Sequence, residues 1–246
     1  MNECCVKGFK WDGQPQGRIE TTSSWGSTYV TGSNPEAAVL VIHDIFGWTF
    51  PNIRLLADAY AEETNATVYV PDFFGGEVLS SEILCKDVSE WGPLNLPSFL
   101  ARNSKEVREP EIFAFAKELR EKYRRVGAIG FCYGGWAVFR LGAKSSGGLV
   151  DCITTAHPSW LVKEEIDNVD VPVQILAPEI DPVFTPELKE LCTRVIPSLG
   201  LDYDYQHFPA LVHGFAVRGN MESEAEVRGL VRAKNAAVHW FNQYLH

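Results

Sequence analysis

The sequence predicts an α/β protein in which a mostly parallel central sheet is flanked by helices on both faces. Short apolar runs alternate along the chain with longer amphipathic stretches, which is the pattern of repeated strand and helix units. The runs consist of small and β-branched residues, as strands buried on both faces require. They cover residues 37–42, 67–70, 126–129, 152–156 and 173–177. Residues 203–208 alternate in polarity instead, which predicts a strand nearer the edge of the sheet.

Two of the amphipathic stretches predict helices with defined starts. Pro110 suits the first turn of one helix, and the apolar residues after it recur at spacings of three or four. The last helix is expected to begin at Ser223, with Glu226 completing a capping box. Its apolar stripe is Val227, Leu230, Val231, Val238, Phe241 and Leu245. Both helices should therefore pack an apolar face on the sheet.

The length of 246 residues, 46% of them hydrophobic, predicts a single domain with one large core. Residues 73–103 interrupt the regular alternation with glycine and proline, and leave room only for a short helix near residues 81–91. An irregular connection of this length is typical of a lid or insertion over a site. Its aromatic residues could form the apolar wall of a small-molecule pocket or belong to the core: Phe73, Phe74, Trp91 and Phe99.

The charge balance argues against two classes of partner. A formal net charge of -10 repels phosphate backbones and anionic membrane surfaces, so neither nucleic acid nor a membrane is expected as a partner. The sequence shows no secretory signal and no apolar run of roughly 20 residues, and we expect a cytoplasmic protein. Its six cysteines are widely scattered and are expected to be reduced, without a zinc site.

The clearest chemical signal is the segment Gly130-Phe131-Cys132-Tyr133-Gly134-Gly135, between a predicted strand and a predicted helix. This arrangement is typical of a nucleophile elbow, here with cysteine as the nucleophile. Glycines are required because the tight turn leaves no room for side chains beside the nucleophile. The helix N-terminus that follows favours the thiolate of Cys132. Without suitable partners, the same segment would be only a turn around a buried cysteine.

Two partners follow Cys132 in the order acid, then histidine. Asp181 comes just after the strand at 173–177, where open α/β sheets place their sites, although Glu179 is a nearby rival. His213 lies between the last predicted strand and the final helix, and its place in the chain order favours it over five other histidines. Nucleophile, acid and base in this order predict an α/β-hydrolase fold with Cys132, Asp181 and His213 as the catalytic residues.

Stabilisation of an oxyanion needs two hydrogen-bond donors. The elbow supplies the N–H of Tyr133, and the loop after the first buried strand is expected to supply the N–H of Ile45. The same loop carries Asp44, a carboxylate expected near the thiol, and Trp48, which is expected to line the site.

These residues resemble those of the dienelactone hydrolases (carboxymethylenebutenolidases), and in particular of their fungal members. The resemblance extends over nearly the full length of the chain. It rests on residues 4–9, 43–47, 71–76, 130–135 and 213–215, which read CCVKGF, HDIFG, PDFFGG, GFCYGG and HGF. The combination is far more specific than any one of these segments.

The resemblance implies a triad in which Cys132 attacks a lactone or activated ester and forms an acyl-thioenzyme that water hydrolyses. It also implies a carboxylate beside the nucleophile, where this chain has Asp44 and bacterial members have glutamate. Members that act on dienelactone bind its carboxylate with arginines, which suggests Arg218 and Arg102 here. Each of these arginines could equally form a surface salt bridge.

The function expected from the sequence is hydrolysis of lactones or small activated esters, without a metal or an organic cofactor. The only partner expected is the small-molecule substrate, and the chain is expected to be a monomer or a homodimer. A thiolate suits activated esters, lactones and thioesters better than amides. Two alternatives remain: a thioesterase acting on acyl thioesters, and a noncatalytic hydrolase-fold binding protein or redox sensor with Cys132 as its reactive thiol.

Overall fold

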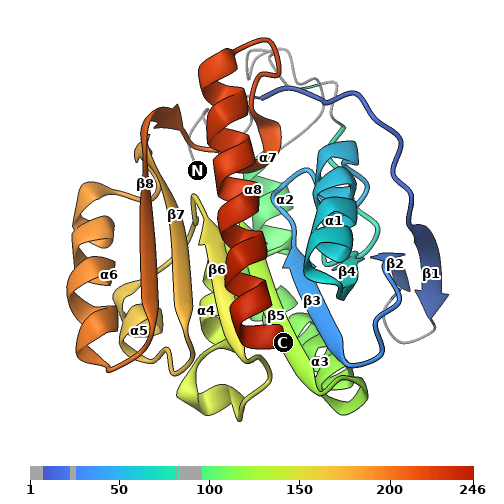
Figure 1. The fold of residues 1–246 in the computed structure, drawn as a ribbon, viewed down its shortest axis with the longest axis horizontal. Helices are drawn as coiled ribbons and strands as arrows, with labels where there is room; N and C mark the ends of the chain where they lie inside the picture. Colours follow the sequence, from blue (N-terminus) through green and yellow to red (C-terminus); the bar gives the residue numbers. More distant parts are fainter. Residues whose placement is uncertain (1–7, 23–25, 81–82, 84–95) are drawn as a thin grey trace.

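The computed structural model describes residues 8–22, 26–80, 83 and 96–246. Its eight strands form one sheet in the order β1-β2-β4-β3-β5-β6-β7-β8 (Figure 1). The strands are β1 (Arg18–Thr22), β2 (Gly26–Thr31), β3 (Ala37–Ile42), β4 (Thr67–Pro71), β5 (Arg125–Phe131), β6 (Cys152–Ala156), β7 (Val173–Ile180) and β8 (Tyr203–Val212). Strands β3 to β8 pair in parallel, whereas β2 is antiparallel to both of its neighbours.

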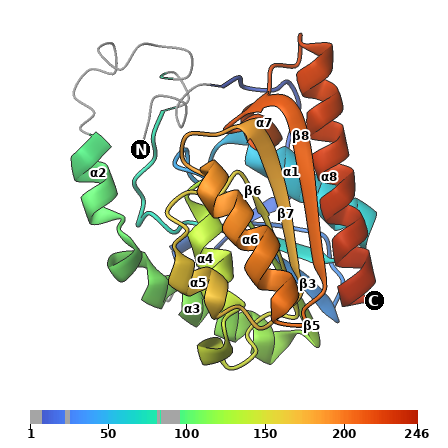
Figure 2. The same ribbon diagram turned by 90° about the vertical axis from the view of Figure 1, so that its left-hand side faces the viewer.

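Helices cover both faces of this sheet. They are α1 (Pro51–Thr64), α2 (Leu96–Arg102), α3 (Lys105–Lys122), α4 (Gly134–Leu141), η4 (Lys144–Ser146), α5 (Lys163–Asp167), α6 (Pro186–Ser198), α7 (Phe215–Arg218) and α8 (Glu224–Leu245). Helices α1 and α8 lie on one face, and α3, α4, α5 and α6 lie on the other (Figure 2). The predicted fold class, a mostly parallel sheet between two layers of helices, is confirmed.

The predicted strands are all present, and the apolar runs mark their positions well. Strands β3 and β6 have the predicted bounds, while β4, β5, β7 and β8 are longer than predicted by one to four residues. Strand β8 lies at the edge of the sheet, as its alternating polarity indicates. The sequence analysis missed β1 and β2, because they are short and contain several polar residues. These two strands extend the sheet at its opposite edge (Figure 1).

Three details of the predicted helices need correction. Pro110 lies inside α3 rather than in its first turn, because the helix begins one turn earlier after Ser104. At the start of α8, the Ser223 hydroxyl accepts the N–H of Glu226, as predicted. The Glu226 carboxylate, however, accepts the N–H of Asn220 at 2.8 Å and does not complete the capping box. Val231 is 48% exposed, because it is rotated by about 100° from the buried Leu230 on the same helix.

The described parts of the long connection at 73–103 pack against the core. Phe73, Phe74 and Phe99 are buried. The ring centroid of Phe74 lies 5.1 Å from that of Phe99 and 5.0 Å from that of Tyr133. The expected helix at 81–91 and Trp91 lie outside the described residues, apart from Ile83. Phe74 thus lies in ring contact both with Phe99 of α2 and with Tyr133 of the turn after β5.

The segment before β1 is hydrogen-bonded to α7, which lies more than 200 residues later in the chain. The N–H of Phe9 donates to the carbonyl of Arg218 at 2.9 Å, and the indole N–H of Trp11 donates to that of Gly219 at 2.9 Å. The buried side chain of Asn52 accepts the N–H of Trp11 at 2.8 Å and donates to the carbonyl of Phe9 at 2.8 Å. This segment therefore helps to fix the position of α7.

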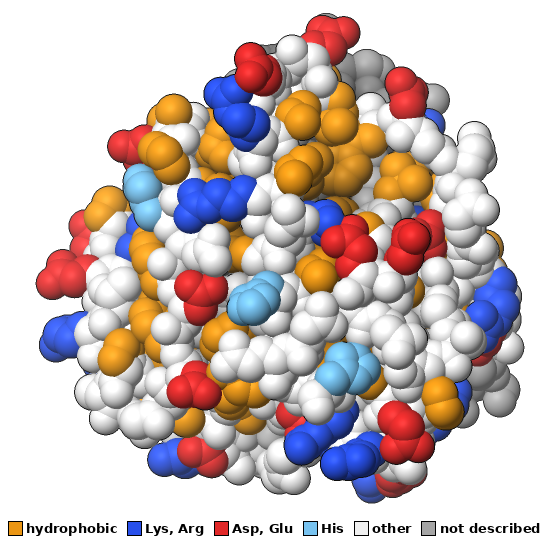
Figure 3. Space-filling model, in the orientation of Figure 1, with side chains coloured by type: hydrophobic (Ala, Val, Ile, Leu, Met, Phe, Trp, Pro, Cys, Tyr) orange, Lys and Arg blue, Asp and Glu red, His pale blue; other side chains and the backbone are white. Residues whose placement is uncertain are grey.

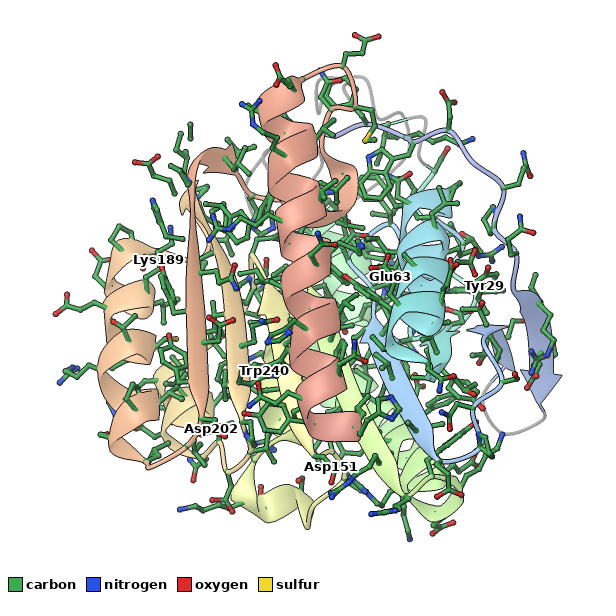
Figure 4. All side chains as sticks on the ribbon, viewed as in Figure 1. Tyr29, Glu63, Asp151, Lys189, Asp202 and Trp240 are labelled. Carbon is green, nitrogen blue, oxygen red and sulfur yellow. The ribbon has the colours of Figure 1, made fainter. Side chains whose placement is uncertain are left out.

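The molecular surface carries charges of both signs. On the face covered by α8, Lys and Arg side chains are scattered among Asp and Glu, without a broad basic patch (Figure 3). Glu63 on α1, labelled in Figure 4, forms an ion pair with Lys234, which joins α1 to α8. None of the helices described is both long enough and apolar enough to span a bilayer.

Candidate active site

The register of the sheet brings the ends of five strands together. Ile42 at the end of β3 is level with Gly130 in β5, so the loops after these two strands leave the sheet side by side. The other neighbouring strands are also paired near their carboxyl ends. Phe131 of β5 pairs with Ala156 of β6, Ala156 with Leu176 of β7, and Ile180 of β7 with Val212 of β8. The residues that follow each strand therefore meet along one edge, where open α/β sheets form their sites.

The turn after β5 has the geometry of a nucleophile elbow. Cys132 has a φ of 50°, a left-handed conformation that is rare for residues with a side chain. Added Cβ atoms would lie 2.1 Å from the carbonyl oxygen of Gly134 at position 130, and 2.2 Å from that of Ile42 at position 134. Position 135 is also crowded, since a Cβ there would lie 2.3 Å from the Cβ of Pro158. The three glycines are therefore required by close packing around the strained cysteine.

The acid and the histidine lie directly after two paired strands. Asp181 follows β7 and His213 follows β8, and a β-bulge near the ends of the two strands separates the pairs Pro178–Phe208 and Ile180–Val212. The Nδ1 atom of His213 lies 2.9 Å from Oδ2 of Asp181, and both side chains are buried. The structure thus brings together the two residues that the sequence analysis selected.

The carboxylate of Asp181 is held by the main chain on its other side. Its Oδ1 atom accepts the N–H groups of Val183 at 2.9 Å and of Phe184 at 3.0 Å. Burial raises the pKa of Asp181, but the hydrogen bond and charge of His213, together with these two N–H groups, lower it below its usual value. The aspartate therefore stays ionised and keeps the Nδ1 proton of His213 directed towards itself.

The pKa of His213 connects the histidine with the cysteine. Burial lowers the pKa of this imidazole, but the negative charge of Cys132 and the hydrogen bond and charge of Asp181 raise it to about 9. The cysteine charge is the largest of the raising effects. At neutral pH this environment favours the protonated imidazole of His213, which loses its proton as the pH rises through about 9.

Other residues that could have served as acid or base have different partners. The carboxylate of Glu179, the rival of Asp181, accepts the N–H of Ala210 at 2.6 Å. His43 contacts the main chain at both ring nitrogens, through the carbonyl of Asp44 at 2.8 Å and the N–H of Phe73 at 3.4 Å. The other four histidines are His157, His207, His239 and His246. Among these, His157 contacts the ring of His213, with centroids 4.8 Å apart.

The two expected oxyanion donors lie in the loops that the register aligns. Tyr133 and Ile45 are both buried. Within the described ranges, no protein acceptor takes the main-chain N–H of either residue. Buried N–H groups without a partner are uncommon, so these two are suited to bind a developing oxyanion.

Asp44 and Arg218 form a buried ion pair next to this loop. The Nε atom of Arg218 lies 3.2 Å from Oδ2 of Asp44, and the guanidinium lies over the ring of Phe46 with its Cζ 5.1 Å from the centroid. The other oxygen of Asp44 accepts the N–H of Phe46 at 3.0 Å. Such a pair is costly to break, because the remaining charge would stay buried without compensation. The structure thus joins two residues to which the sequence analysis gave separate roles.

The remaining candidates lie in different environments. Trp48 is buried in the loop after β3, where the guanidinium of Arg54 lies over its ring at 4.8 Å. The side chain of Arg102 is 56% exposed, and its guanidinium binds Glu77 at 2.8 Å. Arg102 therefore forms the surface salt bridge that the sequence analysis left open as an alternative.

The described part of the chain contains three buried cysteines that form no disulfide bond, Cys132, Cys152 and Cys192. Burial raises the pKa of Cys152 and Cys192, in the latter case to about 12, so these two thiols are poorly reactive. Cys4, Cys5 and Cys85 lie outside the described residues. Among the residues that the structure describes, no group of three or more metal-binding side chains is arranged around a common point.

The electrostatic coupling between Cys132 and His213 predicts a measurable pKa change. In Cys132→Ala, the largest effect that raises the pKa of His213 is absent, while burial still lowers it. We expect the pKa of His213, measured by NMR titration of its ring protons, to be well below the value of about 9 in the native protein. Cys192→Ala is the control and should leave it unchanged. An equal pKa in Cys132→Ala and in the native protein would show that the two side chains are not coupled.

A strained cysteine after a central strand, with an aspartate and a histidine after two later strands of the same sheet, is the arrangement typical of the α/β-hydrolase class. The sequence profile of the Dienelactone hydrolase family matches residues 27–245. The chain belongs to this family, whose members hydrolyse esters and lactones. Its relatives include Hydrolase tropI of Talaromyces stipitatus, 30% identical over 98% of this chain and 96% of that protein, and the human Carboxymethylenebutenolidase homolog, 30% identical over 88% and 87%.

Solved structures support the same fold. A dienelactone hydrolase from Anabaena variabilis has a TM-score of 0.67 at 14% identity, with 94% of this chain and 100% of that chain covered. Carboxyl esterase 2 from Tuber melanosporum has a TM-score of 0.64 at 13% identity, with 98% and 91% covered. The family match and these structures confirm the resemblance, the fold and the class of enzyme that the sequence predicted.

Proposed function

We propose that this protein hydrolyses lactones or small activated esters through an acyl-thioenzyme formed on Cys132. The observation that supports this proposal most strongly is the arrangement of Asp181, His213 and Cys132. The Nδ1 atom of His213 lies 2.9 Å from Oδ2 of Asp181, and the charge of Cys132 is the largest of the effects that raise the His213 pKa to about 9. A thiolate prepared in this way is a strong nucleophile at neutral pH. The names of the relatives, a carboxymethylenebutenolidase homolog and a Dienlactone hydrolase, support a lactone or ester as the substrate.

The proposed reaction begins with attack of the Cys132 thiolate on the carbonyl carbon. As the carbon–sulfur bond forms, the carbonyl electron pair moves to oxygen, which the N–H groups of Tyr133 and Ile45 bind. When the intermediate collapses, the bond to the alcohol oxygen breaks and His213 gives its proton to that oxygen. In a lactone this alcohol remains part of the same molecule and becomes a hydroxyl group of the product.

Water then completes the proposed cycle. His213, now neutral, takes a proton from water as the new carbon–oxygen bond forms, and the intermediate collapses with loss of the thiolate. Asp181 holds the imidazole in the required tautomer in both halves of the reaction, and its negative charge stabilises the imidazolium. The product is a carboxylic acid, and the thiolate–imidazolium pair is restored.

Of the two arginines considered for a substrate carboxylate, Arg218 is the better candidate. It is buried beside Asp44 and lies only five residues after His213, whereas Arg102 binds Glu77 at the surface. A substrate carboxylate near Arg218 would compete with Asp44 for the same guanidinium. We therefore extend the proposal to lactones and esters that carry a carboxylate.

We also propose that the chain acts as one soluble cytoplasmic domain, as a monomer or a homodimer.

Trapping of the intermediate tests the proposed function. After mixing with p-nitrophenyl acetate and rapid quenching in acid, we expect peptide mass spectrometry to find an acetyl group on Cys132. The adduct should accumulate in His213→Ala, because deacylation loses its base. Acetylation at another residue, with Cys132 unmodified in both proteins, would contradict the proposal. Rates on a panel of lactones, aryl esters and acyl thioesters distinguish it from a thioesterase.

A further inference from the structure

A serine that the sequence analysis did not select contacts the nucleophile. The Oγ atom of Ser159 lies 3.3 Å from Sγ of Cys132, and both side chains are buried. The main chains of the same two residues are also joined, since the N–H of Ser159 donates to the carbonyl of Cys132 at 2.7 Å. This contact follows from the sheet register, because β6 ends beside β5 and Ser159 comes three residues after its last residue, Ala156.

The segment around Ser159 is held in a strained conformation against the site. His157 and Trp160 have φ values of 40° and 59°, so two residues with side chains adopt the left-handed region within four positions. The ring of His157 contacts the ring of His213, with centroids 4.8 Å apart. Pro158 packs closely against Gly135 of the elbow. Strain of this kind is typical of functional sites, where surrounding packing maintains it.

The hydroxyl of Ser159 differs from the other buried hydroxyls nearby in its partner. Thr155 donates to the carbonyl of Gly130 at 3.0 Å, and Thr154 donates to the amide oxygen of Gln174 at 3.2 Å. Among the described residues, the sulfur of Cys132 is the only hydrogen-bond partner of the Ser159 hydroxyl. A thiolate has no proton to give, so in that state the serine is the donor.

We propose that Ser159 is a further catalytic residue, whose hydroxyl donates a hydrogen bond to the Cys132 thiolate and stabilises it as nucleophile and as leaving group. The inference rests on the function proposed above. In acylation, the thiolate electron pair forms the carbon–sulfur bond, and the hydrogen bond from Ser159 weakens. In deacylation, that bond breaks and the electron pair returns to sulfur, where the hydroxyl donates to it again. Ser159 keeps its own proton throughout.

The pH dependence of alkylation tests this proposal without requiring turnover. Iodoacetamide reacts with the thiolate, so its rate at the Cys132 peptide, followed by mass spectrometry, has a midpoint at the pKa of that thiol. In Ser159→Ala we expect this midpoint to rise by about one to two pH units, the range expected for loss of a hydrogen bond to a charged group. Thr155→Val is the matched control, because it removes a buried hydroxyl from the same strand end that does not contact the sulfur. Its midpoint should equal that of the native protein.

A second pair of variants distinguishes the effect of losing the hydroxyl from the effect of changing the size of the side chain. Thr and Val have similar shapes, so Ser159→Thr should keep a midpoint near the native value, whereas Ser159→Val should show the rise. An unchanged midpoint in both Ser159→Ala and Ser159→Val, or an equal rise in Thr155→Val, would overturn the proposal. Failure of the proposed function is a separate result, because it would appear as turnover by a protein without Cys132.

Discussion

Cys132→Ala is expected to lower kcat/KM for p-nitrophenyl acetate by about four orders of magnitude or more. The variant removes the atom that forms the acyl intermediate, and loss of a nucleophile has effects of this size in enzymes with a comparable triad. Alanine and cysteine both carry a Cβ, so both should be equally strained at the φ of 50° found at position 132. The loss should therefore reflect chemistry rather than unfolding.

The measurement is steady-state kinetics of Cys132→Ala beside a matched control variant. Cys192→Ala removes another buried thiol, on α6, and is expected to retain the native rate. Circular dichroism and thermal unfolding of both variants would show that the fold is kept. Native turnover by Cys132→Ala would exclude an acyl intermediate on this cysteine, and it would direct attention to the noncatalytic or sensing role of the thiol.

Asp181→Asn is expected to lower kcat by about three to four orders of magnitude. Oδ1 of Asp181 accepts the N–H groups of Val183 and Phe184, and the asparagine oxygen can take over both bonds. The amide nitrogen would then face Nδ1 of His213 and donate to it. This forces the imidazole proton onto Nε2, on the side where the histidine must accept a proton during the deacylation step.

Two measurements distinguish this mechanism from simple destabilisation. Loss of the Asp181 charge and of its hydrogen bond should lower the pKa of His213 below about 9, as NMR titration would show. Glu179→Gln is the matched control, because Glu179 lies two residues earlier and binds the N–H of Ala210. It should keep near-native kcat. Equal losses in the two variants would contradict a specific role for Asp181.

The sequence was sufficient to predict those features that depend on local pattern. Five apolar runs and one segment of alternating polarity located six strands of the sheet, and the glycines around Cys132 indicated the elbow whose close packing the structure explains. Chain order selected Asp181 and His213 from among several acids and histidines, and these two lie 2.9 Å apart. Their catalytic roles remain predictions for the experiments above.

Features that depend on register between distant strands could not be predicted in the same way. Ser159 reaches the sulfur only because β6 pairs with β5, and no pattern within residues 157–160 indicates that pairing. The ion pair between Asp44 and Arg218 joins residues 174 positions apart, so each was assigned a role without the other. Strands β1 and β2 were missed because their sequences are short and partly polar.

Residues 8–11 are hydrogen-bonded to α7 and to the residue after it, so the position of Arg218 depends in part on this segment. The carbonyl of Arg218 is held by Phe9, and the side chain of Asn52 fixes that segment in place. Substitutions near the amino end, far in sequence from any reacting atom, would therefore be felt at the arginine that neutralises Asp44. If Arg218 binds the substrate as proposed, substitutions in residues 8–11 are expected to change substrate choice while the nucleophile, the acid and the base stay the same.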